Sequence, residues 1–241
     1  MKVIGVIPAR YNSSRFPGKP LADILGKPMV QHVFERVSAS DKIDEVVVAT
    51  DHEDIKQTVL NFGGKVVMTR EDHETGSDRM AEVVSKMEGD IFVNIQGDEP
   101  LIHTGTIDKL VEAALENPES VITAKTKLED MEDVQDPNVV KVIADSKDTA
   151  IYFSRSPIPY NRSKEPTTYY KHLGIYSYPR NVITKFVDLP QSPLERVEVL
   201  EQLRLLENDY TIKVIETTYD AVGVDVPEDI QKVETIMGVT Q

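Results

Sequence analysis

The segment KVIGVIPARYNSSRFPGKP, residues 2–20, joins an apolar run to a basic loop. Residues 2–7 predict a buried strand, because the run is short, rich in Val and Ile, and followed by a proline. Arg10, Arg15 and Lys19 come next, with no acidic residue among them. In open α/β sheets, ligands bind beyond the carboxyl ends of the strands, so this loop is a candidate ligand site.

Apolar runs and amphipathic segments keep alternating through the first half of the chain. The predicted strands cover residues 2–7, 45–50, 65–68 and 91–95, and the predicted helices cover residues 28–37, 53–62, 79–87 and 106–115. Gly63 and Gly64 are expected to end the second helix, as glycine often does. Strands that alternate with helices favour βαβ units, so the predicted fold class is α/β with a mostly parallel central sheet.

The second half of the chain is less regular. Its predicted strands cover residues 121–127, 139–144, 150–153, 172–177 and 211–216, and its predicted helices cover residues 193–207 and 227–237, the latter with Pro227 in its first turn. The Pro- and Ser-rich residues 154–168 predict a mobile loop. No repeat or linker divides the chain, so we expect one domain over residues 1–241, with a β-rich portion at residues 121–178.

Composition narrows the functional classes. The 241-residue chain has no cysteine, which excludes thiol catalysis, disulfides and zinc-thiolate sites and fits a reducing compartment. Its formal net charge of −14 disfavours general binding of nucleic acid. No apolar run approaches the roughly 20 residues that span a bilayer, and the N-terminus shows no signal-peptide pattern. We therefore expect a cytoplasmic protein with neither a nucleic-acid nor a membrane partner.

The basic loop has the chemistry of a polyphosphate site. Ser13, Ser14 and Gly18 allow backbone N–H groups to approach a phosphate closely. Arginine and lysine neutralise a triphosphate and stabilise departing pyrophosphate. The loop matches neither the Walker A pattern nor the GxGxxG fingerprint. The alternative is a solvated basic loop, but its position after the first strand favours function.

Two acidic turns are candidates for a metal site. Asp98 lies in the turn GDEP, directly after a predicted strand, and Asp225 precedes the predicted helix that starts at Pro227. Carboxylates bind Mg²⁺, which commonly shares its ligands with substrate phosphates. The alternatives are an ordinary β-turn for Asp98 and helix capping for Asp225. Two aspartates from distant segments can together hold metal at a phosphoryl centre.

Three further features have structural interpretations. The segment DHED, residues 51–54, resembles a metal cluster, but its place before a helix predicts capping and a favourable helix-dipole interaction. Taken alone, His172 is a hydrogen-bonded structural histidine and Glu201 a solvated helix residue. Glu201 and Gln202 are adjacent and would point about 100° apart on a helix. Both could contact one ligand only near a helix end or around a wrapped substrate.

Longer pieces of the sequence resemble the CMP-KDO synthetase family, the 3-deoxy-manno-octulosonate cytidylyltransferases. In chain order they are PARYNSSRFPGKPLADILGKPM, VATDHEDI, MTREDHETGSDRMAEV, VNIQGDEPLI, YFSRSPIP, KHLGIYSY, SPLERVEVLEQLRLLE and GVDVPEDI. The first piece and QGDEP are specific to sugar nucleotidyltransferases, and HLGIYSY and LEQLR to the KDO branch. The resemblance implies a nucleotide-diphospho-sugar transferase fold whose β-rich portion forms a homodimer interface.

The resemblance also implies an activity and its residues. The chain would activate KDO with CTP and Mg²⁺, giving CMP-KDO and pyrophosphate for lipopolysaccharide biosynthesis. Contacts to the CTP phosphates fall to Arg10, Ser13, Arg15 and Lys19, and contacts to the cytidine to Ser77, Asp78, Arg79 and Gln96. Mg²⁺ would bind Asp98 and Asp225, which with Arg15 and Lys19 form the expected catalytic set. The sugar would contact Arg155, His172, Tyr176, Glu201 and Gln202, with Arg155 a candidate partner for its carboxylate.

The expected reaction is a direct displacement, in which the anomeric hydroxyl of the sugar attacks the α-phosphorus of CTP. The chain departs from many family members in two places. The stretch from Pro159 to His172 is short, and TGSDR stands where many relatives have SGTER. The 8-amino analogue of KDO or another acidic sugar therefore stays an alternative substrate. A non-catalytic nucleotide-binding protein on the same fold is the second alternative.

Overall fold

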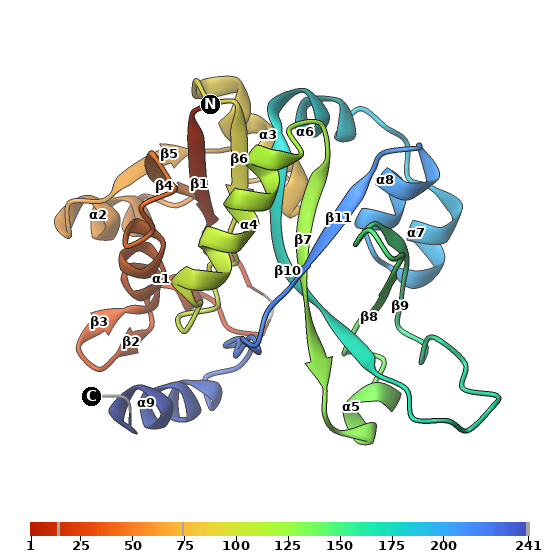
Figure 1. Cartoon of the computed structure of the whole chain (residues 1–241). Coiled ribbons are helices and arrows are strands. Elements are labelled where there is room, and N and C mark those ends of the chain that lie inside the picture. The colour runs from red at the N-terminus through yellow and green to blue at the C-terminus, as the bar shows by residue number, and fades with distance from the viewer. Residues whose placement is uncertain (14, 74, 240–241) are drawn as a thin grey trace.

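The computed structural model describes residues 1–13, 15–73 and 75–239, so Ser14 of the basic loop lies outside the described residues. A mixed central sheet runs through the molecule in the order β11-β7-β10-β6-β1-β4-β5 (Figure 1). Its strands are β1 (Val3–Pro8), β4 (Glu45–Thr50), β5 (Lys65–Met68), β6 (Ile91–Asn94), β7 (Val121–Leu128), β10 (Tyr169–Pro179) and β11 (Ile212–Glu216). Strand β1 pairs in parallel with β4 and β6, β4 with β5, and β11 with β7, whereas β10 is antiparallel to both of its neighbours. The predicted α/β class with a mostly parallel sheet is confirmed.

Helices cover both faces of the sheet. One face packs against α1 (Met29–Ser38), α2 (Glu53–Asn61) and α4 (Thr104–Glu116), and the other against α3 (Gly76–Lys86), α6 (Arg180–Phe186) and α8 (Gln202–Glu207). Strand β1 serves both cores, because Val3 and Ile7 point to one face while Ile4 and Val6 point to the other. A strand buried on both faces reads as a continuous apolar run, which is the pattern in the sequence.

The portion at residues 121–178 contributes to the central sheet and also extends beyond it. Strands β7 and β10 are members of the sheet, and β8 (Lys141–Ala144) and β9 (Ala150–Ser154) form an antiparallel pair that joins it through β10. Helix α5 (Met131–Gln135) and the irregular residues 155–168 lie at this end (Figure 1).

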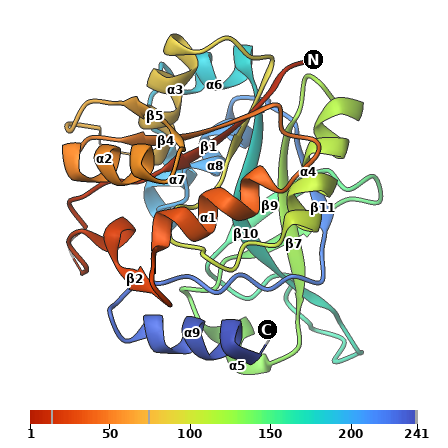
Figure 2. The ribbon, with the colours of Figure 1, turned by 90° about the vertical axis from the view of Figure 1, so that its left-hand side faces the viewer.

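Short elements after β1 pack against the C-terminal helix. A short helix (Lys19–Leu21) is followed by the hairpin of β2 (Asp23–Ile24) and β3 (Lys27–Pro28). Helix α9 (Asp229–Val239) packs beside β2 through an apolar cluster that includes Val224 and Val233 (Figure 2). This contact brings the segment before α9 to the loop that follows β1.

The prediction of one helix at residues 193–207 is wrong. The segment forms α7 (Pro193–Glu198) and α8, separated at Val199 by a left-handed backbone with φ of 53°. A left-handed residue cannot continue a right-handed helix, and the chain therefore turns between the two.

Helix ends also differ from the prediction where capping decides them. Helix α3 begins at Gly76, because Thr75 and Asp78 form a capping box. Helix α9 begins at Asp229 rather than Pro227, and the Asp229 carboxylate reaches back to accept hydrogen bonds from the N–H groups of Asp225 and Val226. Among the described residues, no helix is both long and apolar enough to cross a membrane.

Candidate active site

Three distant segments meet at the carboxyl ends of β1 and β6. The side-chain ammonium of Lys19 donates to Asp98 Oδ2 at 2.7 Å and to the Val224 carbonyl at 2.8 Å. The Val224 N–H donates back to the Asp98 carbonyl at 2.9 Å. A Cβ on Gly97 would lie 2.3 Å from the carbonyl oxygen of Pro8, so only glycine allows this close approach. The basic loop, the GDEP turn and the segment before α9 therefore form one site.

The Asp225 side chain does not cap helix α9, which was the alternative role for this residue. Asp229 takes that role, and the backbone N–H groups of Val226 and Asp225 lower the pKa of the Asp229 carboxyl. The Asp225 carboxylate pairs instead with Arg15, Nη2 to Oδ1, at 3.0 Å. Both side chains of this pair are more than half exposed, so the pair adds little to stability. Asp98 and Asp225 are thus each paired with a cationic side chain of the basic loop.

The first cavity, of about 350 Å³, opens above this junction. It is lined by Pro8, Ala9, Arg10, Ser13, Lys19, Pro20, Met29, His73, Thr75, Gly76, Arg79, Gln96, Gly97, Asp98 and Glu201. Thr75 and Gly76 begin α3, so the positive end of this helix faces the cavity together with the cations of the basic loop. These cations and the helix end favour an anion in the cavity, although the carboxylates of Asp98 and Glu201 line it too.

The second cavity, of about 360 Å³, adjoins the first and shares Gln96 and Glu201 with it. Its lining is Pro8, Gly76, Ser77, Asn94, Gln96, His172, Gly174, Tyr176, Tyr178, Val199, Leu200, Glu201 and Gln202. Neither lysine nor arginine is among these described lining residues. Amide, hydroxyl and imidazole groups there suit hydroxyl groups of a ligand.

Gln96 stands at the boundary of the two cavities in a defined orientation. Its Nε2 donates to the Gly174 carbonyl at 2.8 Å. Gly174 lies in an irregular part of β10 between Leu173 and Tyr176, where Thr123 Oγ1 donates to nearby carbonyls. With the amide nitrogen held, the side-chain oxygen of Gln96 is the acceptor left for a ligand.

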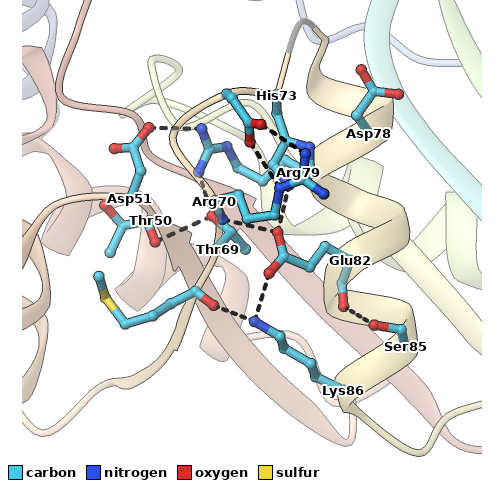
Figure 3. A network of polar contacts seen from close by, with 12 residues as sticks. Thr50, Asp51, Thr69, Arg70, His73, Asp78, Arg79, Glu82, Ser85 and Lys86 are labelled. Atoms are coloured by element: carbon cyan, nitrogen blue, oxygen red, sulfur yellow. Dashed lines mark hydrogen bonds and ion pairs between the residues drawn. The ribbon is translucent and has the colours of Figure 1, made fainter.

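Arg79 is held by a buried network that the sequence did not indicate. Its Nη2 donates to Asp51 Oδ2 at 2.7 Å, and its Nη1 donates to Thr69 Oγ1 (Figure 3). Asp51 Oδ1 also accepts from the backbone N–H of Tyr11 at 3.2 Å. Asp51 therefore joins the loop after β1 to helix α3. The capping predicted for residues 51–54 is confirmed for His52, whose Nδ1 accepts from the Asp54 N–H, but not for Asp51.

His73 is a lining residue of the first cavity that sequence reasoning missed. Its Nε2 lies 2.5 Å from Glu82 Oε2, beside Lys86 and the backbone of Arg70 (Figure 3). Burial acts to raise the pKa of Glu82, but hydrogen bonds from Lys86, the Arg70 N–H and His73 together lower it to about 2. The charged Glu82 thus orients His73. The one sequence feature that could have indicated His73 is its position shortly before the predicted helix that carries Arg79.

His172 and Tyr176 line the second cavity as neutral groups. Burial lowers the pKa of His172 to about 3, and its Nε2 lies 3.0 Å from Thr123 Oγ1. Burial also raises the pKa of Tyr176 well above its ordinary value. These contacts agree with the interpretation of His172 as a hydrogen-bonded structural histidine, and they place it against the cavity as well.

Glu201 and Gln202 stand at the start of α8. Two adjacent residues can contact one ligand near such a helix end. Burial raises the pKa of Glu201, whose Oε2 accepts from Ser77 Oγ at 2.6 Å. Glu201 is therefore not the solvated residue that the sequence alone suggested. Ser77 joins the second cavity rather than the first.

Four predicted site residues lie outside the lining of both cavities: Arg15, Asp78, Arg155 and Asp225. The guanidinium of Arg155 donates to the carbonyl oxygens of Pro137, Glu198 and Val199, which hold it beside α7. Its contact with the Val199 carbonyl places it next to a lining residue of the second cavity, and its contact with the sugar carboxylate stays a prediction. The Asp78 carboxylate accepts from the Thr75 N–H as part of the cap of α3, and its contact with the cytidine stays a prediction.

Comparison with known proteins identifies the family. The chain matches the family described as Cytidylyltransferase over residues 4–215. It is 48% identical to the 3-deoxy-manno-octulosonate cytidylyltransferase of Solibacter usitatus (strain Ellin6076), covering 98% of this chain and 94% of the relative. It is 45% identical to the enzyme of that name from Escherichia coli, covering 98% and 96%. The chain belongs to the 3-deoxy-manno-octulosonate cytidylyltransferase family.

Solved structures agree with this family. A CMP:2-keto-3-deoxy-manno-octonic acid synthetase complexed with CTP superimposes on the full length of both chains with a TM-score of 0.97 and 45% identity. A 4-diphosphocytidyl-2C-methyl-D-erythritol synthase from Anaerococcus prevotii DSM 20548 covers 98% of this chain with a TM-score of 0.66 and 16% identity, which shows the shared fold alone.

Proposed function

We propose that this chain transfers the cytidylyl group of CTP to KDO, forming CMP-KDO and pyrophosphate for lipopolysaccharide biosynthesis. The observation that carries the proposal is the pair of joined cavities. The lining of one includes cations and a helix N-terminus, the lining of the other has no lysine or arginine among its described residues and is rich in hydroxyl and amide groups, and they meet at Gln96 and Glu201. A nucleoside triphosphate and a polyhydroxylated sugar need these two environments side by side. The names of the full-length relatives support the same substrates.

In this proposal the triphosphate lies in the first cavity. Arg10, Ser13 and Lys19 bind its oxygens, and the N-terminus of α3 adds positive potential. Arg79, held by Asp51, and Gln96 lie at the nucleoside side. The sugar lies in the second cavity against His172, Tyr176 and Gln202, with its anomeric hydroxyl directed at the α-phosphorus. Pyrophosphate leaves toward Lys19 and Arg15, which stabilise its charge.

Asp98 and Asp225 fit a Mg²⁺ site. The described residues contain no cluster of three or more potential metal-binding side chains, but Mg²⁺ commonly takes one or two carboxylates and completes its shell with water and substrate phosphates. Both carboxylates are held by cations here, which shows that positive charge is favourable at each. Bound Mg²⁺ would neutralise phosphate charge between them. Lys19 and Arg15 are then free to contact phosphate oxygens.

The proposal includes a single-domain, cytoplasmic homodimer that associates through the portion at residues 121–178. Met131, Ile151 and Tyr160 in this portion are large apolar side chains that are 57%, 56% and 87% exposed. Large exposed apolar side chains that gather into one patch are typical of a protein–protein interface, and we propose that these residues contribute to one. Light scattering should report twice the monomer mass for the purified chain and a smaller mass for Ile151→Glu.

The decisive test is pyrophosphate release with CTP and Mg²⁺, comparing KDO, its 8-amino analogue, a sialic acid and no sugar. We expect release that depends on KDO, with CMP-KDO as the product. The Asp98→Ala variant should lose most turnover, while Asp41→Asn at an exposed position should keep it. Release only with another acid would change the substrate, and CTP binding without release would support a non-catalytic protein.

A further inference from the structure

Two buried side-chain amides in the second cavity have atoms without hydrogen-bond partners. Asn94 and Gln202 are only 9% and 8% exposed. Within the described part of the chain, Asn94 Oδ1 and Gln202 Nε2 are buried and make no hydrogen bond. One is an acceptor and the other a donor, and both residues line the same cavity.

Such atoms are costly, because a buried polar group without a partner loses its hydrogen bonds to water and gains none in return. Nearly all buried polar atoms in native proteins are paired, so an exception needs a reason. An apolar side chain of similar size would serve packing better at either position. Polar groups that lower stability in this way are expected at functional sites, where a ligand supplies the missing hydrogen bond.

The fold directs the two amides at one space from different elements. Asn94 ends β6 and lies opposite Tyr176 of β10, so both side chains leave the same face of the sheet. Gln202 begins α8, directly after Glu201. His172, whose pKa is lowered to about 3, lines the same cavity as a neutral group.

We propose that Asn94 and Gln202 form a pair that binds hydroxyl groups of the uncharged polyol part of the sugar. The inference rests on the proposed function and adds Asn94 as a residue that determines sugar specificity. A hydroxyl group donates and accepts at once, so it can satisfy both an amide oxygen and an amide N–H. With no lysine or arginine among the described lining residues, this cavity does not attract the sugar carboxylate. The carboxylate end therefore faces the first cavity.

The test is the variant Asn94→Leu, with Gln202→Met as an independent second variant. Each removes the amide and keeps an apolar side chain of similar length. We expect the KM for KDO to rise about 10- to 100-fold, the effect of one lost hydrogen bond to a buried group. The Kd for CTP should stay unchanged by titration calorimetry, and the Tm should stay level or rise, because an unpaired amide has been removed.

Thr106→Val is the matched control. Thr106 Oγ1 is buried and hydrogen-bonded to Thr217 Oγ1 at 2.8 Å, and neither residue lines the two cavities. This variant should lower the Tm and leave the KM for KDO unchanged. In Asn94→Leu we expect the opposite, a higher KM for KDO without a lower Tm. This difference distinguishes a ligand contact from a structural role.

Either of two results would overturn the inference in an enzyme that is active with KDO. One is an unchanged KM for KDO in both variants, and the other is a fall in Tm together with weaker CTP binding. If Asn94→Leu does not fold, Asn94 is structural and that part of the inference is wrong, while Gln202→Met decides the rest. A wild-type protein that binds CTP but never uses KDO would instead refute the proposed function, and this inference would fall with it.

Discussion

The two cavities differ in how their polar groups are held. In the first, Lys19 pairs with Asp98, beside the Arg15–Asp225 pair, through contacts that are partly or largely exposed, whereas Arg79 is held by a buried pair with Asp51. In the second, the pKa of His172 is lowered to about 3, and the lining residues Val199 to Gln202 connect α7 to α8, two helices joined by the buried ion pair of Glu195 and Arg204. The exposed ion pairs beside the first cavity can change partners when a polyanion binds. The polar groups that line the second cavity are instead supported by buried contacts between the helices next to it.

The largest expected effect comes from breaking the buried pair. Arg204 Nε donates to Glu195 Oε2 at 2.8 Å, and both side chains are less than a tenth exposed. Arg204→Met leaves the Glu195 carboxylate buried without its partner, which typically costs about 3–5 kcal/mol of unfolding free energy. Urea denaturation measures this loss.

The double variant Glu195→Gln/Arg204→Met should recover part of that loss, since no buried charge is left. The exposed variant Glu53→Gln is the control and should change stability by less than about 0.5 kcal/mol. A loss below about 1 kcal/mol in Arg204→Met would remove the contrast between the two cavities.

Lys19→Met should damage catalysis rather than folding. Removing a donor that stabilises transition-state charge typically lowers kcat by about 10²- to 10³-fold. The Tm should change little, because the Lys19–Asp98 pair is partly exposed. Steady-state pyrophosphate release and thermal melting check the two parts. A large fall in Tm with normal turnover per folded molecule would show that Lys19 is structural.

The free energy of unfolding should depend on pH through His172 in the second cavity. Burial lowers the pKa of His172 from 6.5 to about 3, so between these values the unfolded chain binds the extra proton. The stability from this neutral histidine is present above pH 6.5 and is lost as the pH falls toward 3, by up to about 1.4 kcal/mol per unit. Unfolding of wild type and His172→Gln from pH 7 to pH 5 should give a shallower slope in the variant. Parallel slopes would show that His172 is accessible to protons.

Val199→Gly should have the smallest effect. The φ of 53° is unfavourable for a β-branched residue, and the side chain is 75% exposed. Relief of backbone strain, less the entropy that glycine adds to the unfolded chain, should stabilise the protein by about 1 kcal/mol. Val197→Gly inside α7 is the control and should destabilise by a similar amount. A loss in both variants would mean that Val199 contributes more by contact than it costs in strain.

Sequence reasoning worked best where the signal is local. Strands β4 and β5 have the predicted ends, because apolar β-branched runs bounded by polar residues specify strands without help from distant parts. The position of Lys19 and Asp98 beyond their strands also followed, since parallel strands present their carboxyl ends at one edge. The break between α7 and α8 at Val199 could not be predicted from the sequence. The residues around it favour a helix, and only the fold imposes the left-handed conformation.

The sequence by itself determined the α/β class, the basic loop, the acidic turns and the family, because each depends on short runs or ordered motifs. Only the tertiary structure decided which side chains face a ligand. It engaged Arg155 with backbone carbonyls, paired Asp51 with Arg79 across 28 positions, and left Asn94 and Gln202 with unpaired atoms in one cavity. Such pairings join residues far apart in the chain, and local composition carries no record of which polar group a distant strand or helix will meet.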